Sequence, residues 1–252
     1  MLIGSLVCCA AIYAFAKLVG LWRGPLPTGL GLLAYSTIWP GVATRPFAQR
    51  RPANRTAAFS LMAQGTAVMA GAVTCWIMLW HSDIGPFARG WLGIAVILCT
   101  FHLGLSDVVT GGLRLNGFAV RRLFDAPLRS RSLREFWSLR WNHAFVQMNQ
   151  VVFMPALRRR FGRHAAVAAF LLSGLLHELA ISFPVGAGYG TPTLYFALHA
   201  AATNAEGRLK VLRWHPWARR LWTWAWLLLP LPLLFHRAFR DALVLPLVGG
   251  TR

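Results

Sequence analysis

Long apolar runs alternate with short polar links along the whole chain. A helix rises ~1.5 Å per residue, so ~20 apolar residues are enough to cross a bilayer. The pattern predicts six spans, at about 2–21, 57–80, 90–110, 165–183, 191–206 and 221–234. Shorter apolar stretches at 29–39 and 142–157 predict a re-entrant segment and a partly embedded helix. We therefore expect an all-α polytopic membrane protein, with about six to eight membrane helices and further interfacial helices around a buried chamber.

The amino-acid composition supports this class. Hydrophobic residues make up 56% of the chain and charged residues 13%, about half the ~25% that is usual in soluble domains. So much apolar surface excludes a disordered chain and argues against a water-soluble globule. The run at 2–21 has no basic leading segment and no clear cleavage site, which favours a retained span. We treat residues 1–252 as a single membrane domain.

Basic residues are concentrated in alternate links. The chain has 26 Lys and Arg against 7 Asp and Glu. The links after the first, third and fifth spans are rich in them, whereas those after the second and fourth carry one and none. By the positive-inside rule, the basic links face the cytoplasm and contact anionic headgroups, which argues against a nucleic-acid partner. We expect an integral protein of a bacterial inner membrane, with Lys17 extending from the first span toward the interface.

Metal and disulfide chemistry are not expected. The four cysteines lie in apolar runs and form no C-x-x-C pair: Cys8, Cys9, Cys75 and Cys99. A zinc site or a disulfide framework would need a different spacing.

Ionisable groups within an apolar run point to chemistry, because they are costly inside a bilayer. His177 and Glu178 are adjacent, about twelve residues into the fourth span. A hydrogen bond between helices would explain one such residue, but two in succession favour a functional site. Ile181 stands where the H-E-x-x-H zinc motif needs its second histidine, which excludes that motif.

A second group of polar residues lies where the long basic link becomes apolar. Residues 135–143 alternate aromatic, basic and amide side chains. An interfacial helix with Trp anchors and Arg on headgroups explains most of them. It explains Asn142 and His143 less well, because these two residues open the apolar stretch.

Together these two motifs carry a family resemblance. Phe-Trp-x-x-Arg-Trp-Asn at 136–142, followed by Ser-Gly-x-x-His-Glu at 173–178, resembles the membrane-bound O-acyltransferase (MBOAT) superfamily, and its wax-synthase-like branch most. Further stretches support the branch: Trp39-Pro40-Gly41 with Arg45-Pro46-Phe47, Tyr195-Phe196-x-x-His199 through Glu206, and Leu234-Phe235-His236-x-x-Phe239. The resemblance covers about 39–246.

The resemblance implies that His177 is the catalytic histidine and Asn142 the asparagine of the catalytic region. The side chains that we expect to support the site or line its cavity are Glu178, Ser173, Trp141, His143, His199 and Glu206. Arg140 is a candidate for binding the phosphates of coenzyme A.

The same residues suit acyl transfer chemically. Moving an acyl group from a thioester to an alcohol needs a base for the hydroxyl proton, which an imidazole supplies. It also needs a donor for the developing oxyanion, which the Asn142 amide would supply. We therefore expect acyl-CoA as co-substrate, a hydrophobic alcohol as acceptor, as in wax ester synthesis, membrane lipids as neighbours, and no bound cofactor or metal.

Two other functions remain open from the sequence. The first is transfer of a short acyl or acetyl group to a terpenoid, polyketide or sugar hydroxyl. The second belongs to another class: a small transporter or channel, in which His177, Glu178, His199 and Glu206 would form a proton or ion path.

Overall fold

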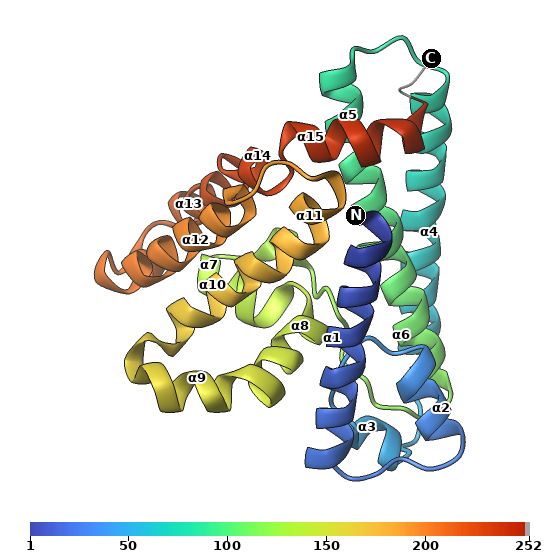
Figure 1. The fold of residues 1–252 in the computed structure, drawn as a ribbon. Coiled ribbons are helices and arrows are strands. Elements are labelled where there is room, and N and C mark those ends of the chain that lie inside the picture. The colour runs from blue at the N-terminus through green and yellow to red at the C-terminus, as the bar shows by residue number, and fades with distance from the viewer. Residues whose placement is uncertain (250–252) are drawn as a thin grey trace. The chain divides into compact units, whose positions relative to one another are not determined.

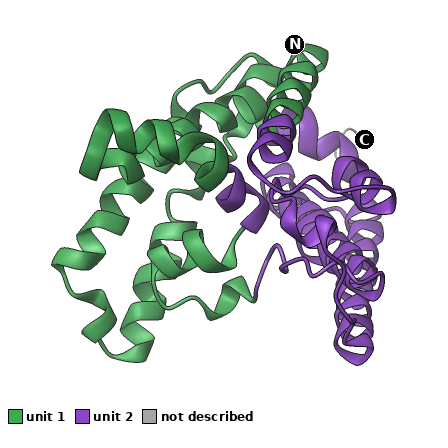
Figure 2. Ribbon diagram, turned by 90° about the horizontal axis from the view of Figure 1, so that it is seen from below, with its two compact units in different colours: residues 1–15, 126–141, 149–239 green, residues 16–125, 142–148, 240–252 purple. Residues whose placement is uncertain are grey.

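The structure, a computed structural model, describes residues 1–249, and the regular structure of these residues is helical throughout. This confirms the predicted all-α class. The chain forms two compact units, each built from three stretches (Figure 2). Unit 1 comprises 1–15, 126–141 and 149–239, and unit 2 comprises 16–125, 142–148 and 240–252. The single membrane domain expected from the sequence stays a prediction.

Four helical stretches are long and apolar enough to cross a membrane: Leu2–Arg23, Arg55–Trp80, Pro86–Leu115 and His143–Val185. They contain the first four predicted spans. The fifth predicted span is helical as α12 (Thr191–Arg208), and the sixth coincides with α13 (Pro216–Leu228) and α14 (Leu231–Leu234), which Pro230 separates. The polytopic architecture is confirmed, while the number of six to eight membrane helices stays a prediction.

Unit 2 is organised around the long helix α4 (Arg55–Trp80), which packs along the continuous stretch from α5 to α6 (Figure 1). That stretch consists of α5 (Pro86–Ile97), η1 (Leu98–Leu105), a π-helical segment, and α6 (Ser106–Leu115). The other elements of unit 2 are the second half of α1 (Leu2–Arg23), α2 (Leu30–Thr37), α3 (Arg45–Ala48), α8 (His143–Met148), η8 (Arg240–Val244) and η9 (Leu245–Val248).

Glycines let these helices of unit 2 approach closely. A Cβ on Gly65 of α4 would lie 2.6 Å from the backbone oxygen of Gly104 in η1. A Cβ on Gly111 of α6 would lie 2.8 Å from the backbone oxygen of Ala58. Small residues at such contacts are typical of membrane helices, where close packing of the backbones replaces hydrophobic association.

Lys17 does not extend toward the interface, and this prediction was wrong. Its side chain is buried, and Nζ donates to the carbonyl oxygens of Tyr35, Trp39 and Gly41 at 2.6–2.7 Å. The ammonium also lies 3.8 Å from the centre of the Tyr35 ring. Because α2 and the loop that follows it surround the ammonium with carbonyl groups, Lys17 fastens this loop to α1.

A second buried cation of unit 2 closes the end of α4. Arg89 donates from Nη1 to the carbonyl oxygen of Leu79 at 3.0 Å and to that of Gly249 at 3.1 Å, and from Nη2 to that of Ser82 at 2.5 Å. These bonds tie the last turn of α4 to the loop that follows it and to the residue after η9.

Unit 1 is built from short helices and π-helical turns. Two of its helices, α10 (Ala165–His177) and α12, pack along each other (Figure 1). Its other elements are the first half of α1, η2 (Pro127–Arg129), α7 (Leu133–Glu135), η3 (Phe136–Arg140), η4 (Asn149–Phe153), α9 (Met154–Phe161), η5 (Gly162–His164), η6 (Glu178–Ser182), α11 (Phe183–Val185), η7 (Val211–Arg213) and α15 (Arg237–Phe239). Gly162, with φ 51°, makes the turn from α9 into α10.

Two apolar clusters fill unit 1. The first joins Leu133 and Phe136 to Ala202 and Leu227, and the second joins Ile181 to Tyr195, Phe196 and Leu234. The Trp137 side chain packs against both clusters. The region around Trp137 is therefore the centre of unit 1.

Candidate active site

His177 is the last residue of α10, directly before the π-helical turn η6. Its Nδ1 lies 2.7 Å from the carbonyl oxygen of Ser173, one turn earlier. A carbonyl only accepts hydrogen bonds, so Nδ1 carries the proton and Nε2 of the neutral ring keeps its lone pair. Ser173 itself is buried. The local helix therefore orients His177 as a base through Nε2.

Glu178 is used to hold the next helix. One of its carboxylate oxygens, Oε1, accepts from the backbone N–H groups of Gly190 and Thr193, both at 3.0 Å, and from the Thr193 hydroxyl at 2.8 Å. These groups form the N-terminus of α12, where a negative charge is favoured by unpaired N–H groups and by the helix dipole. Glu178 thereby fastens α12 to the end of α10.

Aromatic rings form one wall beside His177. The Phe196 ring of α12 lies 4.4 Å from the His177 ring, centre to centre. Trp137 of η3 lies 5.6 Å from Phe196, and Phe170 of α10 lies 6.1 Å from Trp137. The base therefore contacts Phe196, which belongs to a group of rings from three different elements of unit 1.

His199 belongs to the same cluster, one turn beyond Phe196 on α12. Its side chain is fully buried, 4.3 Å from the Tyr195 ring and 5.2 Å from the Trp137 ring, centre to centre. Its Nδ1 accepts a hydrogen bond of 3.0 Å from the indole N–H of Trp137. Its Nε2 is buried and has no hydrogen-bond partner. His177 and His199 thus both contact one aromatic cluster, and a cavity that both line stays a prediction.

Glu206 holds the start of α7, the helix that leads into the turn carrying Trp137. Its carboxylate accepts from the backbone N–H groups of Leu133 at 2.6 Å and Arg134 at 3.1 Å, and from the Trp222 indole N–H at 3.2 Å. The hydroxyl of Ser132 accepts from the next N–H group at 2.9 Å. The first N–H groups of α7 are thus capped, which sets the start of η3 and the place of Trp137.

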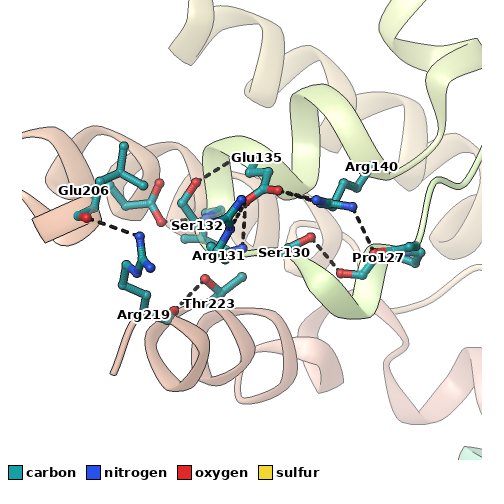
Figure 3. Close-up of polar contacts among 12 residues, drawn as sticks. Pro127, Ser130, Arg131, Ser132, Glu135, Arg140, Glu206, Arg219 and Thr223 are labelled. Atoms are coloured by element: carbon teal, nitrogen blue, oxygen red, sulfur yellow. Dashed lines mark hydrogen bonds and ion pairs between the residues drawn. The ribbon is translucent and has the colours of Figure 1, made fainter. Parts of the chain in front are cut away.

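Arg140, the candidate for binding phosphates, is paired with Glu135 (Figure 3). Its Nε and Nη2 both lie 2.6 Å from Glu135 Oε1. Burial acts to raise the pKa of Glu135, but hydrogen bonds from the Arg131 backbone N–H and from Arg140, with their charges, outweigh it and lower that pKa. The ion pair thus joins the residue before η3 to the last residue of η3. A phosphate-binding role for Arg140 stays a prediction.

Asn142 and His143 belong to unit 2, so the histidine cluster of unit 1 is described without them. Asn142 has φ 47°, a left-handed conformation that asparagine tolerates better than most residues. Its side-chain oxygen accepts from the N–H of Phe145 at 3.1 Å and thereby caps α8. His143 is buried, and its N–H donates to the carbonyl oxygen of Leu123 at 2.9 Å. Catalysis by Asn142 stays a prediction.

Of the predicted residues, His177, Ser173 and Glu178 lie together at the end of α10, His199 joins His177 through the aromatic rings, and Glu206 caps α7. The predicted Trp141 stacks on Phe136, with ring centres 5.3 Å apart, and serves packing.

Sequence reasoning missed Trp137, whose indole N–H orients His199. Its position in the Phe-Trp-x-x-Arg-Trp-Asn motif was the available signal, but its partner is 62 residues away. Within residues 1–249, no group of three or more His, Cys, Asp or Glu side chains is placed to hold a metal ion.

Comparison with known proteins bears on this region directly. Residues 120–198 match the membrane bound O-acyl transferase family. The match includes Trp137, Asn142 and His177, and it confirms the resemblance predicted from the sequence. With the apolar helices described above, it identifies an integral membrane protein.

Relatives of this family were found in Arabidopsis thaliana. The chain is 32% identical over 154 residues to the probable long-chain-alcohol O-fatty-acyltransferase 2, a match that covers 55% of this chain and 44% of that relative. It is 32% identical over 111 residues to the probable long-chain-alcohol O-fatty-acyltransferase 1, covering 40% of this chain and 32% of the relative. The matches thus span less than half of the length of these relatives.

Proposed function

We propose that this protein is a membrane O-acyltransferase that moves an acyl group from acyl-CoA to the hydroxyl of a hydrophobic alcohol, as in wax ester synthesis. The observation that carries the proposal is the state of His177. Its Nδ1–H is held by Ser173, which leaves Nε2 free to accept the proton of an alcohol. The family match, and relatives whose names specify long-chain alcohols and fatty acyl groups, support it.

The surroundings of His177 favour a hydrophobic acceptor over a sugar. Phe196 lies against the base, and Trp137 packs against Phe196. A sugar bound there would leave several hydroxyl groups unpaired, each at a cost of ~1–3 kcal/mol. A single hydroxyl at the end of a hydrocarbon chain avoids that cost, so a long-chain or terpenoid alcohol is the proposed acceptor.

The carboxylates argue against a proton or ion path. Such a path needs acidic groups that are free to exchange protons. Glu206 instead accepts three hydrogen bonds around the start of α7, and Oε1 of Glu178 accepts three at the start of α12, while Oε2 of Glu178 is buried without a partner.

A competition assay tests the function and the acceptor together. Purified protein in nanodiscs receives one labelled acyl-CoA together with equimolar hexadecanol, a terpenoid alcohol and a glucoside without a long alkyl chain. We expect label in the ester of hexadecanol or of the terpenoid alcohol. Preferential labelling of the glucoside would contradict the acceptor assignment, and no ester from any acceptor would contradict the function.

The proposed donor requires the basic links to face the cytoplasm, where acyl-CoA is found. This orientation follows from the alternation of Lys and Arg along the chain. Single cysteines introduced in 158–163 should resist a membrane-impermeant reagent in intact cells, while cysteines in 185–190 should react. Labelling of 158–163 from outside would reverse the orientation.

A further inference from the structure

The two histidines of unit 1 are held with their protons on opposite ring nitrogens. His177 donates from Nδ1 to a carbonyl oxygen, so its Nε2 carries a lone pair. His199 accepts at Nδ1 from the Trp137 indole, which has a proton and no lone pair to offer, so the proton of the neutral His199 ring lies on Nε2. One ring is therefore set as an acceptor and the other as a donor.

We propose that Nε2–H of His199 donates a hydrogen bond to the carbonyl oxygen of the acyl group during transfer, and that Trp137 is the positioning residue that keeps His199 in this tautomer. The proposal rests on the function proposed above, and it adds a substrate-contacting role for a residue outside the two catalytic motifs.

The first support is the state of the donor itself. His199 is fully buried, and its Nε2 has no partner. A buried N–H group without an acceptor is rare and costly, so a partner that binds there explains why it persists. Trp137 is hydrogen-bonded to Nδ1 of the same ring, and Tyr195 packs against the face of the ring. The His199 ring therefore cannot rotate to find another acceptor for Nε2–H without breaking the hydrogen bond from Trp137.

The second support is the shared setting of the two rings. Trp137 contacts both His199, with ring centres 5.2 Å apart, and Phe196, 5.6 Å apart. Phe196 in turn contacts His177 at 4.4 Å. The acceptor nitrogen and the donor nitrogen thus belong to one continuous group of rings in unit 1.

Acyl transfer needs a base and at least one donor to the oxyanion, and these are the roles proposed for His177 and His199. The alcohol oxygen bonds to the thioester carbon as Nε2 of His177 takes the hydroxyl proton, and an electron pair moves to the carbonyl oxygen. There the His199 N–H stabilises the negative charge. When the carbon–sulfur bond breaks, that pair returns to form the carbonyl of the ester, and the thiolate leaves with the proton from His177. Ester and coenzyme A thiol are the balanced products.

Turnover of matched variants gives the first test. His199→Leu should lower kcat by ~10²–10³-fold, the loss typical of one oxyanion donor, with the KM for hexadecanol nearly unchanged. His199→Gln keeps an N–H₂ group near the place of Nε2 and should restore most of kcat. Trp137→Phe should lower kcat less than His199→Leu does. Controls are the exposed His215→Gln and Trp217→Phe, which should match the wild-type protein.

Binding without turnover gives the second test. A palmitoyl-CoA analogue with a methylene in place of sulfur keeps the carbonyl, whereas S-hexadecyl-CoA lacks it. Wild-type protein and His177→Ala should bind the ketone more tightly than the thioether, and His199→Leu should lose this preference. Unchanged preference in His199→Leu, or kcat equal to wild type, overturns the proposal while the acyltransferase function stands. If the protein prefers the ketone in a His199-dependent way but forms no ester, the hydrogen bond from His199 is supported and the acyltransferase function is contradicted. If neither analogue binds, both the role of His199 and the acyltransferase function are contradicted.

Discussion

In unit 1 the carboxylates of Glu178 and Glu206 accept hydrogen bonds from backbone N–H groups at helix N-termini, whereas in unit 2 the cations of Lys17 and Arg89 donate to backbone carbonyls. Both solutions satisfy polar backbone groups that a membrane would leave without water. The difference concerns what remains for chemistry. In unit 1 the glutamates fasten helices, while Nε2 of His177 keeps its lone pair and Nε2 of His199 has no hydrogen-bond partner.

Among variants of unit 2, the largest effect is expected at Asn142, the residue of that unit to which the sequence assigns chemistry. Asn142→Asp keeps the oxygen that caps α8 but removes the amide donor. The predicted role as oxyanion donor therefore implies a rate ~10²–10³-fold lower, with thermal unfolding nearly unchanged. An unchanged rate of ester formation would show that Asn142 only caps α8 and that the catalytic groups belong to unit 1.

The next effect is expected where unit 2 relies on a cation. Lys17→Met should lower the free energy of unfolding by ~3 kcal/mol, because buried carbonyls left without a donor cost ~1–3 kcal/mol each and methionine recovers part of this by packing. Thermal unfolding in nanodiscs measures it, with the exposed Lys210→Met as control. Equal stability of the two variants would show that the Lys17 contacts contribute nothing net.

Close packing of α4 in unit 2 should be sensitive to added volume. Gly65→Leu should destabilise the protein by ~1–3 kcal/mol, the usual cost of overpacking, because its Cβ would lie 2.6 Å from the Gly104 oxygen. Gly71 lies on the same helix with nothing within 4 Å of an added Cβ, so Gly71→Leu is the matched control. If both variants unfolded at the same temperature, the contact between α4 and η1 would not be tight.

The smallest effect is expected at a carboxylate of unit 1. Glu206→Gln keeps the shape but loses the charge that two N–H groups of α7 share, and we expect a loss of ~1 kcal/mol. Since α7 leads into the turn that carries Trp137, the rate of ester formation should fall with it. The exposed Asp83→Asn is the control for loss of one negative charge. If Glu206→Gln were as stable and as active as the wild-type protein, the capping of α7 by Glu206 would not be needed for the position of Trp137.

Hydropathy alone predicted the long helices well, because the thickness of the bilayer sets the length of an apolar helix that crosses it. The predicted span 57–80 is α4, which starts two residues earlier, since Asn54 caps it. Lys17 shows the limit of the method: its three carbonyl partners lie 18 to 24 residues away in a loop whose course no local pattern reveals. The sequence does not distinguish a lysine that extends to the membrane interface from one that binds the carbonyl groups of a loop.

The site was predictable only in part, for a related reason. The cost of placing His177 inside an apolar run pointed to it directly. The tautomers of His177 and His199 depend on which groups face Nδ1, and for His199 that group is Trp137, on a π-helical turn with no sequence signature. The sequence pointed to Glu178 and Glu206 as residues that support the site or line its cavity, but it did not reveal their capping contacts across helices.

The most direct measurement is the rate at which purified His177→Ala forms ester from palmitoyl-CoA and hexadecanol, compared with wild-type protein and with His215→Ala. If His177 is the base, its removal should lower the rate by ~10²–10⁴-fold, while thermal unfolding stays that of the wild-type protein and His215→Ala remains fully active. Near-normal turnover by folded His177→Ala would contradict the account.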